Sequence, residues 1–153
     1  MKILVCVDGS EYSQKALEKA SIIAEGCNVN EVAIIHVDEG KLGLSTAARG
    51  GEGYSLSVVD TENLKRIMEE HKEERNKLLQ EALKIFEAKN IKARTILKEG
   101  HPSLTIVKVA AEEEFDMIVI GSRGFGGLKK LFLGSVSNAI VQEAKNCSVV
   151  VVK

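Results

Sequence analysis

Apolar residues along the chain gather in five short runs, and the stretches between the runs have a helical period. Four of the runs are continuous and rich in β-branched residues: 3–7, 32–37, 117–120 and 149–152. Continuous runs of this kind are typical of strands that are covered on both faces in a parallel sheet. We therefore predict four parallel strands at these positions.

The remaining run is residues 91–98. Its apolar or neutral side chains are Ile91, Ala93, Thr95 and Leu97, and they alternate with the basic side chains of Lys92, Arg94 and Lys98. Alternation of this kind predicts a strand with one covered face, which includes Leu97, and one wet face. Such a strand belongs at an edge of the sheet.

Between the runs, apolar positions recur at intervals of three and four residues, as on one face of an α-helix. This period predicts four helices, at about residues 11–27, 61–89, 102–114 and 135–145. Ser10 is suited to cap the first helix, and Pro102 suits the first turn of the third. Residues 39–59 have no clean period, and we expect a long loop there.

Strand and helix alternate to a final strand, which predicts an α/β fold: a doubly wound, five-stranded parallel sheet with helices on both faces. The order 2-1-3-4-5 would put the third strand inside the sheet, whereas 3-2-1-4-5 puts it at an edge. The wet face of residues 91–98 favours the second order. The chain then reverses direction between the first and fourth strands, so a ligand crevice is expected beyond Asp8 and Gly121.

The last strand, residues 149–152, is an edge in either order and consists of four valines. An exposed apolar edge invites aggregation unless something covers it. Pairing with the same strand of a second subunit would give a two-fold homodimer, and we favour that arrangement. The alternative is that helices cover both faces of the strand and that Lys153 alone protects its edge.

The length and charge of the chain narrow the classes of function. At this length, residues 1–153 are expected to form a single domain. Twenty-one basic residues against twenty-two acidic ones give no general attraction to nucleic acid. No apolar run reaches the roughly 18 residues that span a membrane, and the amino terminus turns polar too early for a secretory signal. The three cysteines are interpreted as reduced thiols of a cytoplasmic protein.

Residues 121–135, which read GSRGFGGLKKLFLGS, join the fourth strand to the fourth helix. Glycines allow the main chain to approach a ligand, so several N–H groups can converge on one anion. The start of the helix, at Gly134 and Ser135, adds unpaired N–H groups and the positive end of the helix dipole. The segment therefore predicts a phosphate cradle, with Arg123 as a nearby cation that could balance a polyphosphate.

This segment matches neither of the commonest phosphate-binding motifs. No Walker sequence G-x-x-x-x-G-K-[ST] occurs, and Gly124-x-Gly126 lacks the third glycine of a dinucleotide fingerprint. Lys129 and Lys130 are interpreted as solvated charges rather than as specific ligands. A glycine-rich loop before a helix is also compatible with a simple flexible turn, so the prediction depends on the spacing of the glycines.

That spacing resembles the nucleotide-binding motif of the universal stress protein family: Gly121, two residues, Gly124, nine residues, then Gly134-Ser135. The resemblance extends from the first strand to the last. It implies the branch of the family that binds ATP, an adenine nucleotide alpha hydrolase-like fold with strand order 3-2-1-4-5, and a homodimer through the last strand.

The resemblance also implies which residues form the site. The phosphates and the ribose would be held by four residues of the motif: Gly121, Gly124, Gly134 and Ser135. Asp8 and Val37 would line the adenosine, with the Val37 main chain reading the edge of the adenine. Three residues that flank the motif are further candidates: Ile120, Arg123 and Val136. Mg²⁺ or Mn²⁺ would be carried by the phosphates, because we find no set of protein ligands for a metal.

Two functions remain in competition. The favoured one is a nucleotide-dependent regulatory or stress-response protein that changes its state or its protein partner when ATP fills the crevice. The alternative is a slow ATPase or nucleotide-hydrolysing enzyme of the same fold, for which Asp8 is the only carboxylate placed near the cradle. One carboxylate supports hydrolysis weakly, so no catalytic residue is predicted.

Overall fold

The computed structural model of the protein describes residues 1–27, 29–40, 61–124 and 133–153, without the side chains of residues 61–65 and 68. The strands are β1 (Lys2–Cys6), β2 (Glu31–Asp38), β3 (Ala93–Glu99), β4 (Met117–Gly121) and β5 (Ser148–Val152). The helices are α1 (Glu11–Gly26), α2 (Thr61–Glu87), α3 (Pro102–Glu112) and α4 (Ser135–Glu143). Most of the loop predicted at 39–59 lies outside the described residues.

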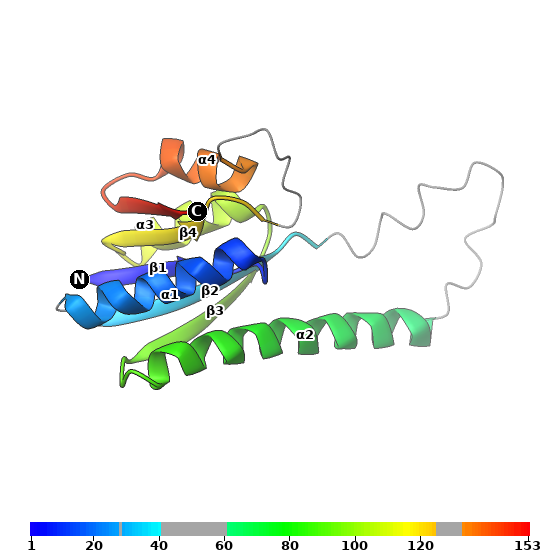
Figure 1. Ribbon diagram of the computed structural model, residues 1–153. Helices are drawn as coiled ribbons and strands as arrows, with labels where there is room; N and C mark the ends of the chain where they lie inside the picture. The colour runs from blue at the N-terminus through cyan, green and yellow to red at the C-terminus, as the bar shows by residue number, and fades with distance from the viewer. Residues whose placement is uncertain (28, 41–60, 125–132) are drawn as a thin grey trace.

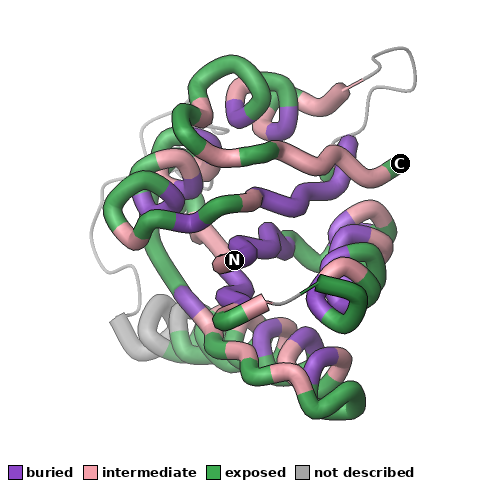
Figure 2. Tube along the Cα trace, turned by 90° about the vertical axis from the view of Figure 1, so that its left-hand side faces the viewer, coloured by how far each residue is buried: buried purple, intermediate pink, exposed green. Residues whose placement is uncertain are grey.

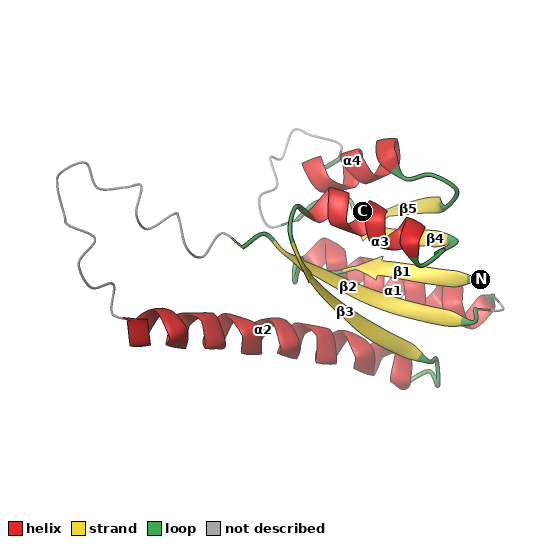
Figure 3. Cartoon of the chain, turned by 180° about the vertical axis from the view of Figure 1, so that it is seen from behind, coloured by secondary structure: helices red, strands yellow, loops and turns green. Residues whose placement is uncertain are grey.

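The strands form one sheet in the order β3-β2-β1-β4-β5, and every neighbouring pair is parallel. Helices α1 and α2 cover one face of the sheet, and α3 and α4 cover the other (Figures 1 and 3). The predicted fold class is therefore confirmed: an α/β, doubly wound, five-stranded parallel sheet with strand order 3-2-1-4-5 and helices on both faces.

Each face of the sheet has its own core because successive side chains of a strand point to opposite faces. In β1, Ile3 and Val5 pack against α1 and α2, whereas Leu4 and Cys6 pack against α3 and α4. Figure 2 shows the buried residues concentrated along the central strands and on the helix faces that meet them. The central strands are covered on both sides, which explains their continuous apolar sequences.

Helix α2 is longer than the part of the sheet that it covers, and its first half extends past the sheet (Figures 1 and 3). Among its described side chains, the buried ones, Leu79, Ala82 and Phe86, lie in the second half. Phe86 is completely buried, and burial of such a side chain contributes about 1.5–3 kcal/mol to folding. Most of the described side chains of the first half are exposed, in keeping with its charged sequence; Ile67 there is 38% exposed.

The edge position predicted for β3 is confirmed, but the prediction of its covered face was wrong at Leu97. Leu97 is 39% exposed, whereas Ile96, one residue earlier, is buried. The register explains the difference, since Ile96 lies opposite Ile35 of β2 and joins the core under α3. At the other edge, β5 pairs with β4, and its four valines are half-buried.

Among the described residues, no helix combines the length and the apolar character needed to cross a bilayer.

Candidate functional site

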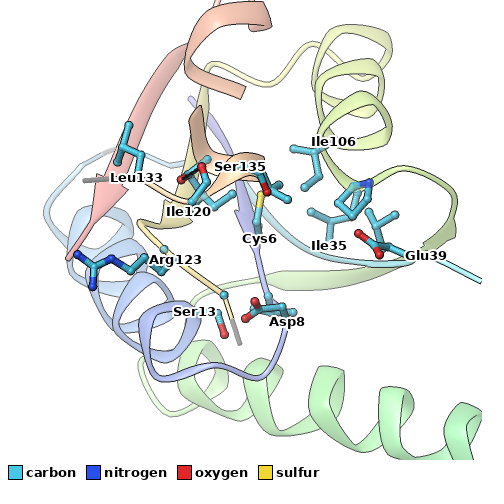
Figure 4. Close-up of a pocket in the computed structure, with 18 residues that line it drawn as sticks. Cys6, Asp8, Ser13, Ile35, Glu39, Ile106, Ile120, Arg123, Leu133 and Ser135 are labelled. Carbon is cyan, nitrogen blue, oxygen red and sulfur yellow. Dashed lines mark hydrogen bonds between the residues drawn. The ribbon is translucent and has the colours of Figure 1, made fainter. Parts of the chain in front are cut away.

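A cavity of about 450 Å³ opens at the carboxyl ends of β1, β2 and β4, beside the first turns of α3 and α4. Figure 4 shows side chains from these elements around one hollow. Its apolar wall consists of Cys6, Val7, Ile35, Val37, Pro102, Ile106, Ile120, Leu133 and Val136. This is the place where a doubly wound sheet with this strand order is expected to bind a ligand.

The structure brings all of the predicted site residues to this cavity. They are Asp8, Val37, Ile120, Gly121, Arg123, Gly124, Gly134, Ser135 and Val136. Sequence reasoning missed other lining residues, among them Ser13, Glu39 and Ser137. Glu39 could have been found from Val37, because alternate residues of a strand share a face.

Asp8 lies where β1 turns into α1. Its Oδ1 accepts hydrogen bonds from the Ser10 amide at 2.9 Å and from the Ser10 hydroxyl at 2.6 Å. Gly9 between them has a φ of 89°, which favours glycine. Ser10 caps α1 by accepting from the Ser13 amide at 3.2 Å, as predicted. Asp8 therefore shapes the turn with one oxygen and lines the cavity as well.

Gly124 lies against that carboxylate. A Cβ atom at Gly124 would lie 2.5 Å from Oδ2 of Asp8, closer than real Cβ contacts come. A side chain at residue 124 would therefore have to displace the Asp8 carboxylate. This contact joins two residues that are far apart in sequence at the mouth of the cavity.

Gly121 also allows two elements to pack closely. A Cβ atom there would lie 2.7 Å from the main-chain carbonyl carbon of Tyr12 and 2.8 Å from its oxygen. The missing side chain of Gly121 thus faces the first turn of α1, and the residue lines the cavity with its main chain. Glycine at this position lets helix and strand pack closely.

The two ends of the glycine-rich segment are tied together at Ser122. Its carbonyl accepts the Gly134 amide at 2.7 Å and the Ser137 hydroxyl at 3.0 Å, and its own amide donates to the Val152 carbonyl at 2.6 Å. The Gly134 amide is therefore already bonded within the protein, to the Ser122 carbonyl. The two stretches of main chain nevertheless converge, as the motif predicted.

Helix α4 presents its first turn to the cavity. Gly134 is the N-cap and has no side chain to satisfy the amides that follow. The Asn138 amide is the first to bond back within the helix, to the Gly134 carbonyl at 2.9 Å. The amides of Ser135, Val136 and Ser137 precede it, and the first N–H groups of a helix lack partners within it. All three residues line the cavity.

Arg123 does not direct its charge into the cavity. Its guanidinium lies 5.7 Å from the centre of the Tyr12 ring, and Nη1 is 3.5 Å from the Tyr12 hydroxyl. Figure 4 shows the side chain pointing away from the other labelled side chains. Nε is buried and has no partner among the described residues. The residue lines the cavity, but the expected balance of phosphate charge by its guanidinium is not present in this conformation.

The Cys6 thiol in the cavity wall is uncharged. Burial, aided by the negative charge of Asp8, raises the pKa of the Cys6 thiol far above its ordinary value, so the group stays protonated. Carboxylates of Asp8 and Glu39 stand at the rim (Figure 4). Within the described part of the chain, no group of three His, Cys, Asp or Glu side chains is placed to hold a metal ion.

The model of the universal stress protein family matches residues 1–153. Universal stress protein YxiE of Bacillus subtilis is 34% identical over 152 residues, which cover 99% of this chain and 98% of that protein. Universal stress protein MJ0577 of Methanocaldococcus jannaschii is 34% identical over 157 residues, which cover 99% of this chain and 94% of that one. The solved structure of MJ0577 has a TM-score of 0.76 at 30% identity, covering 99% of this chain and 94% of that chain.

A solved universal stress protein of Archaeoglobus fulgidus, in complex with dAMP, has a TM-score of 0.67 at 24% identity, covering 100% of this chain and 98% of that one. It shows the same fold and contains an adenine nucleotide. The agreement of the family model and of these relatives extends over essentially the whole chain. The chain therefore belongs to the universal stress protein family.

Proposed function

We propose that the cavity binds ATP, and that the protein acts as a nucleotide-dependent regulatory or stress-response protein. The observation that carries the proposal is the first turn of α4, where the three residues whose amides precede the first bond within the helix all line the cavity. Amides at a helix start, together with the helix dipole, favour phosphate. The adenosine would lie deeper, toward β2 and α3.

The apolar wall suits a purine. Ile35 and Val37 of β2 face Ile106 of α3 and Ile120 of β4 across the same cavity. Binding sites for small molecules are typically apolar with a few polar groups that fix orientation. A neutral thiol at Cys6 fits this half of the site, since it adds no charge beneath the base.

The charges at the rim imply a cation for the phosphates. The carboxylate of Asp8 lines the cavity, and the guanidinium of Arg123 lies over Tyr12. A polyphosphate therefore requires positive charge from elsewhere. We assign it to Mg²⁺ or Mn²⁺ carried by the phosphates; Lys129 and Lys130, interpreted above as solvated charges, lie outside the described residues.

The remaining parts of the proposal follow from the fold. Regulation is favoured over slow hydrolysis because the hydrogen bonds of Ser10 engage one oxygen of Asp8, the carboxylate nearest the cradle. The half-buried valines of β5 support a homodimer through that strand. A cytoplasmic location is proposed from the reduced state expected for the cysteines.

Substitutions at Ser135 test the phosphate cradle. Proline is tolerated at the first helical position, and Gly134 before it has an extended backbone, with φ −70° and ψ 162°, that proline accepts. Ser135→Pro removes one amide, and Ser135→Ala removes only the hydroxyl. By calorimetry we expect Ser135→Pro to weaken ATP binding about tenfold or more, with Ser135→Ala much nearer to wild type and adenosine binding equal in all three.

The proposal fails if the folded wild-type protein binds no ATP. The cradle assignment fails if Ser135→Pro binds ATP as tightly as Ser135→Ala does. Mass measurement of any ligand that accompanies the purified protein gives an independent test of the nucleotide class.

A further inference from the structure

The end of the β1–β2 ladder has an irregular hydrogen bond. The last backbone bond between these strands runs from the Val7 amide to the Ile35 carbonyl, at 2.9 Å. The Val7 carbonyl is 2.9 Å from Nδ1 of the His36 ring. A carbonyl oxygen can only accept, so Nδ1 carries the proton and donates to it.

A regular parallel ladder would use a different donor. After the bond from Val7 to Ile35, the next rung would join the Val37 amide to the Val7 carbonyl. Among the backbone bonds of the described residues this rung is missing. The side chain of His36 stands in its place.

The Val37 amide therefore faces the crevice rather than a neighbouring strand. Along a strand, the main-chain groups of alternate residues point to the same side. The Ile35 carbonyl points toward β1, because it accepts from Val7, and Val37, two residues later, points the same way. Beyond Val7 the chain leaves the sheet at Asp8, and Val37 lines the cavity there.

We infer that His36 is a positioning residue: by donating to the Val7 carbonyl it leaves the Val37 amide available to an acceptor nitrogen of the bound base. The inference rests on the proposed function, since it concerns the base end of the same site. His36 itself contacts no ligand in this scheme. It also holds the end of β1, so that Val7 and Asp8 keep their places in the cavity wall.

Two substitutions distinguish the effect of the hydrogen bond from the effect of the size of the His36 ring. His36→Leu removes the donor, and His36→Asn keeps an N–H group near the position of Nδ1. Without a ring donor, the Val7 carbonyl is expected to take the Val37 amide and extend the ladder by one rung. We expect His36→Leu to weaken adenosine and ATP binding about tenfold, the effect of one hydrogen bond, and His36→Asn to restore most of it.

Inorganic tripolyphosphate, used as a competitor, separates the loss of this hydrogen bond from a general structural defect. Its affinity should be equal in wild type and His36→Leu, whereas a general defect would lower it. Amide hydrogen exchange gives a direct check: without nucleotide, the Val37 amide should exchange fast in wild type and slowly in His36→Leu. If wild type binds ATP and His36→Leu binds it equally, or if tripolyphosphate affinity falls in parallel with ATP, this inference is overturned. If wild type binds no ATP, the proposed function itself fails.

Discussion

The position that a Cβ atom of Gly124 would occupy lies 2.5 Å from Oδ2 of Asp8. These two residues lie in the loops that follow β1 and β4, and a side chain at residue 124 would meet the Asp8 carboxylate at the cavity. The Ser10 amide and hydroxyl both donate to the Asp8 carboxylate, so Asp8 cannot move away without losing those bonds. A side chain at residue 124 would therefore have to displace the Asp8 carboxylate, before any ligand is considered.

Gly124→Val should abolish measurable ATP binding while the protein stays folded. The new side chain must displace either the Asp8 carboxylate or the loop that carries Arg123, and either shift deforms the cavity. Calorimetry measures the affinity, and circular dichroism measures folding. Gly26→Ala is a matched control, since a Cβ atom there meets nothing within 4 Å. Tight ATP binding by folded Gly124→Val would show that this contact does not shape the site.

Gly121→Ala should act on stability rather than on the cavity. Its Cβ atom would meet the main chain of Tyr12 at 2.7 Å, and α1 cannot yield there by a side-chain rotation. Overpacking of this kind typically costs about 1–3 kcal/mol. Denaturant unfolding, compared with Gly26→Ala, measures the loss of free energy of unfolding. A stability equal to wild type would mean that α1 shifts without cost.

The different contacts of Gly121 and Gly124 show which features of the site the sequence could predict and which it could not. The motif spacing predicted which residues meet at the cavity, because the order of the strands fixes which chain ends lie together. It could not show that Gly121 accommodates Tyr12, or that the Arg123 guanidinium lies over the Tyr12 ring. Both facts depend on how α1 packs against β4, and these two elements are separated by about a hundred residues of chain.

The fold, too, was predictable from the sequence in some parts and not in others. Continuous apolar runs predicted the central strands, because burial on both faces leaves a strong signal. At the edge strand β3 the signal is weaker, and alternation alone put Leu97 on the covered face. Ile96 is buried instead because the register places it beside Ile35. Register between strands is a property of the assembled sheet, and a single strand does not encode it.

An ion-pair network at the amino ends of the strands predicts acid sensitivity. The hydrogen bond from Arg94, together with the charges of Arg94 and Lys2, lowers the pKa of Glu31 from its ordinary value of 4.5. Because the folded pKa lies below the unfolded one, the stabilisation is complete above about pH 5 and is lost as the pH falls through the folded pKa.

Glu31→Gln should therefore flatten the decline of stability between about pH 5 and pH 3, measured by denaturant unfolding at several pH values. The effect at neutral pH should stay below about 1 kcal/mol, because the pair is partly exposed. Glu81→Gln, on the exposed face of α2, serves as the control and should leave the slope unchanged. An identical slope for Glu31→Gln and wild type would contradict the network's role.

The outer edge of β5 allows a test of the proposed homodimer that spares the fold. The Ser148 amide donates inward to the Asp116 carbonyl, and the Val152 carbonyl accepts inward from Ser122. Main-chain groups alternate along a strand, so the amide of Val151 points outward, away from β4. Proline is tolerated on an edge strand where its missing N–H faces solvent.

Val151→Pro should therefore remove a bond between subunits and leave the pairing of β4 with β5 intact. We expect light scattering after gel filtration to give a dimeric mass for wild type and a monomeric mass for the folded variant. Val151→Ala, which trims the side chain but keeps the amide, should remain largely dimeric. A monomeric wild type would refute pairing through this edge, and a Val151→Pro variant that is as dimeric as wild type would show that the Val151 amide makes no bond between subunits.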